Sequence, residues 1–348
     1  MIGSRFTHAR NRPFALMLIV VAFLAFAPPA FAGDFARLVY FGDSLSDPGN
    51  YFAAFGTVSL PPFVPIPDAP YAIGGHHFSN GATWAEQLAR QLQRPTSGEP
   101  ALVAPAVFTN YAVGRARARA NAPVFALYDL GTQVNRFLSD FGGHASPANV
   151  YVIWIGANDL DDALNALASD PTGAASGAII QAAIAAVASN IQTLWASGAR
   201  TLLIPNLPDL AVTPAVRGLG PAAQAAATQL TAAYNDALEQ ALQALQALPE
   251  IRFVRLDVSA LLSEILVDPE AFGLTDVQDS CLTFGVMQGA VCERPDRYLF
   301  WDGIHPTRAG HHIIAGAAAH ALRQALASCD GELNRSPWVG IAAAAGRP

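Results

Sequence analysis

Short apolar runs alternate along this chain with longer stretches whose apolar side chains recur at helical spacing. Each run is short and rich in aliphatic, β-branched or aromatic residues, which is typical of strands buried in a parallel sheet. The five predicted strands are Leu38–Phe41, Phe108–Val113, Val150–Ile155, Thr201–Ile204 and Ile251–Leu256.

Helical periodicity predicts the elements between these strands. Apolar side chains three or four positions apart lie on one face of a helix and indicate core packing. Such stripes are Trp84, Leu88 and Leu92; Ile180, Ile184, Ile191 and Leu194; and Leu230, Tyr234, Leu238, Leu242 and Leu245. Pro221 stands in the first turn of the third of these helices, and a last helix is predicted from about Arg308 to Leu326.

The alternation of strands and helices indicates βαβ units and a parallel sheet covered on both faces. No linker or change of composition divides the chain, so we expect one domain over residues 33–330. Ligands of such sheets bind at the carboxyl ends of the strands. Two long loops, about 47–80 and 267–300, contain Pro and Gly. Because loops of this length are uncommon unless they are functional, we expect them to form the walls of a cleft.

The first 32 residues have the pattern of a secretory signal. Three arginines precede the apolar stretch Ala15–Ala27, which is shorter than the roughly 20 residues that span a bilayer. Ala30 and Ala32 then form a signal-peptidase site. We expect export to the periplasm or the extracellular medium after cleavage near Ala32; an uncleaved anchor is the alternative. No later stretch is expected to be long and apolar enough for a transmembrane helix, and residues 331–348 are predicted to be a loosely held tail.

Composition excludes two classes of protein. Hydrophobic residues make up 52% of the 348 and charged residues 14%, which excludes a disordered chain. The net charge is −7, and it becomes −10 once residues 1–32, with three arginines and no acidic residue, are removed. An acidic chain without a basic block is not expected to bind nucleic acid.

Export changes how the three cysteines are interpreted. In an oxidising compartment a local disulfide between Cys281 and Cys292 is expected, and it would stiffen the segment before Asp302. Two unpaired thiols are the alternative. Cys329 is left over, and three scattered cysteines without a CxxC pair do not predict a metal site.

Residues with the chemistry of acyl transfer follow the predicted strands. Ser44 comes directly after the first strand, Asn158 follows the third, and Asp302 and His305 share a turn ahead of the last helix. A serine hydroxyl becomes a nucleophile when a base takes its proton, and the base needs a partner that fixes its tautomer. Ser44, His305 and Asp302 supply these three roles. Taken singly, each residue also suits a helix cap or an exposed turn.

Four segments together resemble the four blocks of the GDSL, or SGNH, hydrolase family. They are GDSL around Ser44, Gly114 with its neighbour, GAND around Asn158 and DGIHPT around His305. The resemblance implies a flavodoxin-like three-layer α/β/α fold with a central, mostly parallel five-stranded sheet. It also implies ester hydrolysis without a metal or other cofactor. The segments HFSNG (77–81), NYAVG (110–114) and DRYLFWD (296–302) look like the secreted bacterial esterase, lipase and lysophospholipase branch.

One position departs from the pattern of that branch. Where a second glycine usually follows Gly114, this chain has Arg115. The resemblance implies an oxyanion hole made by the N–H of Ser44, the Gly114–Arg115 backbone and the Asn158 amide, and a backbone N–H survives this replacement. Arg115 must then adopt the glycine's conformation, at a cost of about 1–3 kcal/mol if that conformation is unusual. The alternating Arg115, Arg117 and Arg119 fit either an anchor for an anionic substrate group or a salt-bridged loop.

The sequence therefore predicts an exported serine esterase that forms an acyl-enzyme on Ser44. The expected partner is a small-molecule or lipid ester, and we expect a monomer. Phospholipase A, lysophospholipase and acyltransferase activities are alternatives within the same chemistry. A noncatalytic exported binding protein is the alternative from another class, and it predicts a missing catalytic residue.

Overall fold

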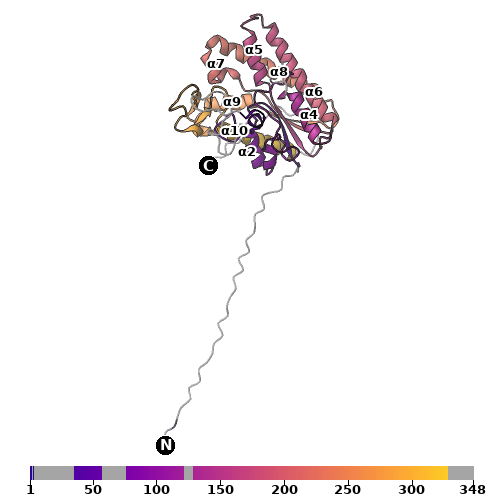
Figure 1. Cartoon of the computed structure of the whole chain (residues 1–348), viewed down its shortest axis with the longest axis vertical. Helices are drawn as coiled ribbons and strands as arrows, with labels where there is room; N and C mark the ends of the chain where they lie inside the picture. Colours follow the sequence, from indigo (N-terminus) through magenta and orange to yellow (C-terminus); the bar gives the residue numbers. More distant parts are fainter. Residues whose placement is uncertain (2, 4–34, 57–75, 121–127, 328–348) are drawn as a thin grey trace. The chain divides into compact units, whose positions relative to one another are not determined.

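The computed structural model describes residues 1, 3, 35–56, 76–120 and 128–327 (Figure 1). The sheet and its helices belong to the unit that begins at Ala32. Four features predicted from the sequence lie outside the described residues. They are the signal peptide, the Pro-rich part of the first long loop, Cys329 and the C-terminal tail.

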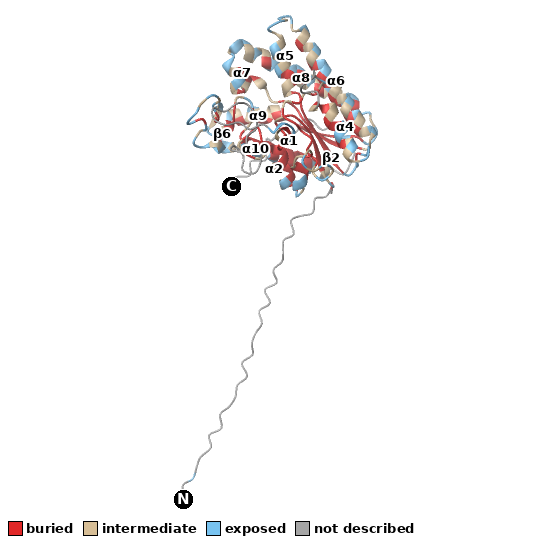
Figure 2. Cartoon of the chain, in the orientation of Figure 1, coloured by how far each residue is buried: buried red, intermediate tan, exposed pale blue. Residues whose placement is uncertain are grey.

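Parallel strands form the central sheet in the order β1-β2-β3-β4. They are β1 (Leu38–Gly42), β2 (Val150–Trp154), β3 (Thr201–Pro205) and β4 (Arg252–Leu256). The first residue of each strand pairs with the first residue of the next, so the carboxyl ends of the strands meet at one edge. Nearly every strand residue is buried, as expected for a parallel sheet covered on both faces (Figure 2).

The predicted strand Phe108–Val113 forms only in part. Asn110 makes a single parallel bridge to Tyr40. The N–H of Tyr40 donates to the Thr109 carbonyl at 3.0 Å, and the N–H of Tyr111 donates to the Tyr40 carbonyl at 2.8 Å. The described sheet therefore has four regular strands instead of the predicted five, with this segment beside β1. The Asn110 side chain hydrogen-bonds three loop backbone groups, and such local bonds compete with a regular ladder.

Helices cover both faces of the sheet and complete the predicted three-layer α/β/α architecture (Figure 1). The first layer contains α4 (Leu130–Asp140), α5 (Ala157–Ala166), α6 (Ala174–Ala196) and α8 (Pro221–Leu245). The second contains α2 (Trp84–Gln91), α3 (Pro95–Gly98) and α10 (Arg308–Ala327). Shorter helices follow the carboxyl ends of strands or the loops: α1 (Asn50–Phe55), α7 (Pro214–Gly218) and α9 (Val258–Val267).

The second long loop contains regular structure of its own. A short parallel pair, β5 (Asp276–Ser280) and β6 (Tyr298–Phe300), frames it. Cys281 and Cys292 form a disulfide with their Cα atoms 4.9 Å apart, so the predicted pairing is confirmed. The N–H of Cys281 donates to the Phe300 carbonyl at 3.0 Å. The cross-linked loop is thereby attached to the strand that leads into Asp302.

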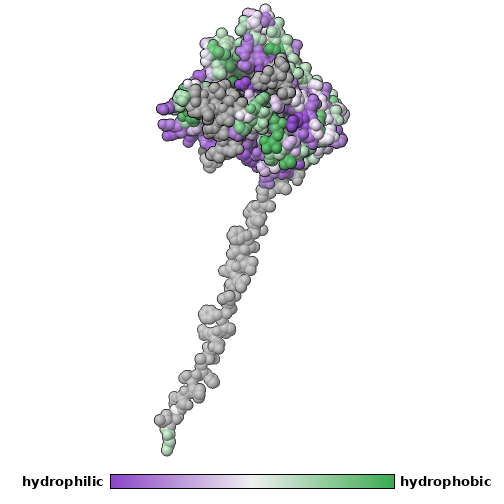
Figure 3. Space-filling model, viewed as in Figure 1, coloured by the Kyte–Doolittle hydropathy of each residue, from purple (hydrophilic) through white to green (hydrophobic). Residues whose placement is uncertain are grey.

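Among the described helices, α6 is long and apolar enough to span a membrane by length and composition. The prediction that no later stretch meets this criterion was therefore wrong. In the folded unit α6 packs against α4, α5 and α8 with a buried stripe that includes Ile180, Ile184 and Ile191. Apolar and polar residues are interspersed over the described surface in Figure 3. The apolar character of α6 thus has a role in core packing.

Candidate active site

The turn after β1 presents Ser44 at the carboxyl edge of the sheet. A Cβ atom at Gly42 would lie 2.5 Å from the carbonyl oxygen of Trp154, so only glycine lets β1 and β2 remain this close where the turn begins. Within the turn, the Ser46 hydroxyl accepts a hydrogen bond from the Trp84 indole at 2.9 Å. The turn is thus fixed to the helical layer, while Ser44 itself stays partly exposed.

The three residues predicted to act together do meet at this edge. Ser44 Oγ lies 2.8 Å from His305 Nε2, although the residues are 261 positions apart. His305 Nδ1 lies 2.8 Å from Asp302 Oδ2 and 3.0 Å from Asp302 Oδ1. The backbone N–H groups of Ile304 and His305 also donate to Asp302 Oδ1, each at 2.8 Å. This arrangement lets a carboxylate orient the imidazole that faces the hydroxyl.

Burial and charge act in opposite directions on the Asp302–His305 pair. Burial raises the pKa of Asp302, but the charge of His305 and the hydrogen bonds from its ring and backbone outweigh burial and leave that pKa below its usual value. Burial lowers the pKa of His305, but the charge and hydrogen bond of Asp302, with a contribution from Asp43, leave it above its usual value. The Asp302 carboxylate therefore stabilises the imidazolium that forms when His305 takes up a proton.

Asp43 is a second buried carboxyl, directly before Ser44 in the chain. Its Oδ1 accepts from the Leu45 N–H at 3.0 Å, while its Oδ2 is buried without a hydrogen-bond partner among the described residues. Burial raises the pKa of Asp43 to about 7, and the charges of His305 and Asp159 act on it in opposite directions. A carboxyl that titrates near neutrality next to the base influences the charge of the site.

Two of the residues predicted to form the oxyanion hole, Gly114 and Asn158, already donate hydrogen bonds to groups of the protein. The Gly114 N–H donates to Asp47 Oδ2 at 2.7 Å, so within the predicted Gly114–Arg115 backbone the candidate oxyanion donor is the N–H of Arg115. Its lack of a side chain matters instead, because a Cβ there would lie 2.2 Å from Phe78 Cε2. The Asn158 amide donates one hydrogen to the Ala116 carbonyl at 2.9 Å, which leaves its second N–H for another acceptor.

Arg115 adopts the glycine-like conformation that its position requires. Its φ is +65°, in the left-handed region that non-glycine residues seldom occupy. Arg117 and Arg119 both pair with Asp162, and Arg119 Nε also lies 3.3 Å from Asp159 Oδ1. For these two arginines the salt-bridged alternative is therefore the correct one.

The segment 77–81 connects the oxyanion side of the site to the histidine turn. The Phe78 ring lies 5.2 Å from the His305 ring, measured between centroids. The Ser79 hydroxyl donates to the Pro306 carbonyl at 2.9 Å, and Asn80 Oδ1 accepts from the Arg308 N–H at 2.6 Å. The sequence did not indicate this role, since the partners are more than 220 positions away.

The neighbouring His76 and His77 do not form a metal site with other residues. His77 is buried with its Nε2 2.7 Å from Glu86 Oε2, at the start of α2. Across the described part of the chain, no three His, Cys, Asp or Glu side chains gather as ligands for a metal ion.

Asp47 is the residue that sequence reasoning missed most clearly. Its carboxylate accepts from the N–H groups of Gly49, Asn50 and Tyr51, which begin α1, and from that of Gly114. Burial raises the pKa of Asp47 to about 6, although all four hydrogen bonds lower it. An Asp ahead of a Gly-Asn pair signals a local cap. The contact with Gly114 has no such local signal.

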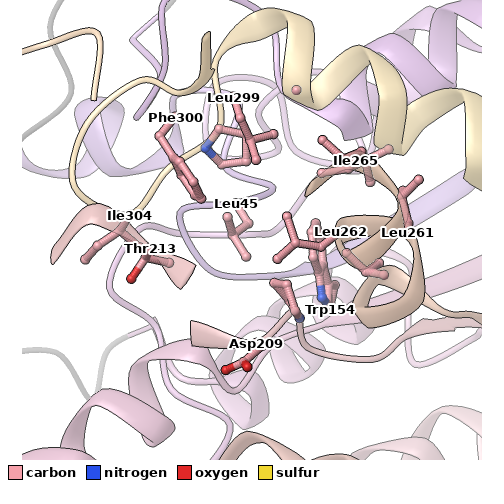
Figure 4. Close-up of a pocket in the computed structure, with 15 residues that line it drawn as sticks. Leu45, Trp154, Asp209, Thr213, Leu261, Leu262, Ile265, Leu299, Phe300 and Ile304 are labelled. Carbon is pink, nitrogen blue, oxygen red and sulfur yellow. The ribbon is translucent and has the colours of Figure 1, made fainter. Parts of the chain in front are cut away.

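An apolar cavity of about 60 Å³ lies beside Ser44 and His305. Its lining includes Leu45, next to Ser44, and Ile304 and Pro306 on either side of His305. In Figure 4 apolar side chains from α9, among them Leu262 and Ile265, point toward the same space, and Asp209 and Thr213 place oxygen atoms at its margin.

Comparison with known proteins gives a consistent assignment. A profile of the GDSL-like lipase/acylhydrolase family matches residues 38–318. The chain is 28% identical over 247 residues to a phosphatidylcholine-sterol acyltransferase of Aeromonas hydrophila, covering 71% of this chain and 65% of that one. It is 24% identical over 387 residues to Lipase 1 of Photorhabdus luminescens, covering 87% of this chain and 55% of that one. It thus spans less than two thirds of either relative.

Among solved structures, a catalytic mutant of an acetylxylan esterase from Geobacillus stearothermophilus is similar to this chain. The two are 15% identical, with 83% of this chain and 95% of that chain covered and a TM-score of 0.45.

Proposed function

The chain belongs to the GDSL-like lipase/acylhydrolase family, and on this premise we propose that it hydrolyses carboxylic esters through an acyl-enzyme on Ser44. One observation carries the proposal. Ser44 Oγ lies 2.8 Å from His305 Nε2, and the same imidazole is held on its other side by Asp302. A noncatalytic binding protein would not need this complete relay.

The geometry supports the following order of events. His305 takes the hydroxyl proton as Ser44 Oγ attacks the ester carbonyl, and Asp302 stabilises the resulting imidazolium. The tetrahedral oxyanion accepts hydrogen bonds from the N–H groups of Ser44 and Arg115 and from the free N–H of the Asn158 amide. His305 then gives its proton to the leaving alcohol oxygen. Water attacks the acyl-enzyme with His305 again as base, and the carboxylic acid leaves as Ser44 regains its proton.

A fluorophosphonate probe tests the nucleophile directly. We expect the wild-type protein to become labelled at Ser44 and to cleave p-nitrophenyl esters. Ser44→Ala should lose both reactions and keep its circular dichroism spectrum. Cleavage by a folded Ser44→Ala variant would refute the proposal.

The apolar cavity beside Ser44 supports an ester whose acyl group is apolar, because most of the side chains that line it are hydrocarbon. Hydrolysis of such an ester is the first candidate. Transfer of the acyl group to an alcohol in place of water is the second candidate, and it is supported by the similarity to the Aeromonas phosphatidylcholine-sterol acyltransferase. Product analysis with added alcohol distinguishes hydrolysis from transfer.

We also propose that the protein is exported and cleaved near Ala32. The arginines, the short apolar stretch and the Ala-x-Ala site within residues 1–32 support this proposal. Mass spectrometry of the protein recovered from periplasm and culture medium tests it. An intact N-terminus on the active protein would contradict cleavage.

A further inference from the structure

We propose that Asp162 is a positioning residue for the oxyanion hole: through Arg117 it holds Arg115 in its left-handed conformation. This inference rests on the proposed function. The segment concerned, residues 114–119, is called the oxyanion loop below.

Arg115 needs external support to remain in this conformation. A left-handed φ of +65° is easily adopted by glycine, but it crowds the Cβ of other residues. Such residues persist where surrounding contacts determine the backbone more strongly than its own preference does. The contacts that hold Arg115 in this conformation should therefore lie next to it.

Arg117 makes one such contact and is itself held by Asp162. Its Nη1 donates to the Arg115 carbonyl at 2.9 Å. Its Nε and Nη2 donate to the two oxygens of Asp162 at 2.6 and 2.7 Å, a bidentate pair. Bidentate pairing fixes the plane of a guanidinium, so the position of Nη1 follows from that of Asp162. Arg117 is 16% exposed and Asp162 24%, so water screens the pair only in part.

Further contacts fix the oxyanion loop on both sides of Arg115. Before it, the Gly114 N–H donates to Asp47 at 2.7 Å. After it, the Ala116 carbonyl accepts from Asn158 at 2.9 Å, and the Ala118 N–H donates to Asp159 at 2.8 Å. The peptide that follows Arg115 is held at both of its polar groups: its N–H, that of Ala116, donates to the Val113 carbonyl at 3.2 Å, and its carbonyl, that of Arg115, accepts from Arg117 at 2.9 Å. The Arg117 bond is the shorter of the two. Together with the Gly114 contact, these bonds set the direction of the Arg115 N–H.

Charge keeps this arrangement assembled at neutral pH. Burial raises the pKa of Asp162, but hydrogen bonds and charge from Arg117 and Arg119 outweigh burial and leave that pKa below its usual value. Asp162 is thus an anion between two arginines, and Asp162→Asn removes that charge with almost no change of shape.

A double-mutant cycle tests the coupling. We expect Asp162→Asn to lower kcat for p-nitrophenyl butyrate about tenfold or more with little change in KM, because an oxyanion contact forms only in the transition state. In an Arg115→Gly background the same change should lower kcat by less than about twofold, since glycine adopts a left-handed φ without support. In an Arg115→Ala background, which also lacks the guanidinium but keeps a Cβ, the full loss should persist.

Asp161→Asn is the matched control, because it removes the same charge one position away on the exposed side of α5. It should leave kcat within about twofold. Equal losses from Asp162→Asn in all three backgrounds, or a loss confined to KM, would overturn the proposal.

Urea unfolding separates this inference from the proposed function. Asp162→Asn should lower the unfolding midpoint less in the Arg115→Gly background than in the Arg115→Ala background. If wild-type protein cleaves no ester, the proposed function fails. The difference in unfolding midpoint between the two backgrounds still tests whether Asp162 supports the conformation of Arg115. If esters are cleaved and neither kcat nor the midpoint shows coupling, only the positioning role is wrong.

Discussion

The Phe78 ring lies 5.2 Å from the His305 imidazole, and the same ring occupies the space where a side chain at Gly114 would lie, with Cε2 only 2.2 Å from a Cβ built there. One aromatic side chain thus lies between His305, the proposed general base, and the oxyanion loop. The distance between these two parts of the site depends on its size.

Gly114→Ala should lower kcat/KM about tenfold to a hundredfold, because displacement of a catalytic group by about 1 Å has effects of this order. Phe78→Leu in the same protein should restore part of the activity by making room for the methyl group. Steady-state kinetics of the single and double variants measure the coupling. Gly316→Ala is the control, since a Cβ at that position on α10 meets nothing within 4 Å. An unimpaired Gly114→Ala variant would show that the ring moves freely.

The pH dependence of kcat/KM should follow the neutral form of His305. Asp302 and Asp43 raise the His305 pKa above 6.5 despite burial, so activity should increase with pH through a midpoint above that value and be lost below it. Asp43→Asn removes a nearby negative charge and should move the midpoint down. Asp279→Asn, an exposed change on β5, should leave it in place. A rate that is constant from pH 5 to pH 8 would contradict the role of His305 as base.

Asn80 should act as a hydrogen-bond acceptor for the backbone that follows His305. Asn80→Ala leaves the Arg308 N–H without its partner and should cost about 1 kcal/mol of stability, with a loss of kcat. Asn80→Asp keeps the acceptor and should retain most activity. Asp170→Ala is the control, because it removes a comparable acceptor, that of the Ala175 N–H, far from the site. It should lower stability without a loss of kcat. Equal kcat values for Asn80→Ala and Asn80→Asp would exclude this role.

The apolar cavity should set the preferred length of the acyl chain. Leu262→Trp reduces its volume and should shift the preference among p-nitrophenyl esters toward acetate, whereas Leu262→Ala should shift it toward longer chains. Each methylene gained or lost is worth roughly 10–200-fold in kcat/KM at most. Val267→Ala, an exposed position on the same helix, should leave the profile unchanged. A profile that is identical in both Leu262 variants would place the acyl group elsewhere.

The sheet and the catalytic relay were predictable because their signals are local. The four strands begin within one residue of the predicted positions, since continuous apolar runs mark buried parallel strands. Ser44, Asp302 and His305 follow from the carboxyl-edge rule and the family blocks. The Phe108–Val113 run was predicted as a strand from the same kind of pattern, but it forms a single bridge. Hydrogen bonds of the Asn110 side chain compete with a regular ladder there, and a hydrophobic pattern does not show such bonds.

The supports of the site could not be predicted in the same way. The contacts of Asp47 with Gly114, of Asn80 with Arg308 and of Asp162 with Arg117 join residues 45 to 228 positions apart. Each depends on where loops lie after folding, and an acidic or amide residue in a loop has many alternative partners. Arg115 was a partial exception: its replacement of a glycine predicted that it would hold the glycine's conformation, but not that this conformation is left-handed.

The four hydrogen bonds accepted by Asp47 also bear on motion. They join the start of α1, directly after the nucleophile turn, to the residue before Arg115, so the two loops that must cooperate are cross-linked through one buried carboxylate. We therefore expect a displacement of one loop to be transmitted to the other. On the proposed mechanism, Ser44 and the Arg115 N–H would then be in place before substrate binds, without a closing step that brings these two groups together.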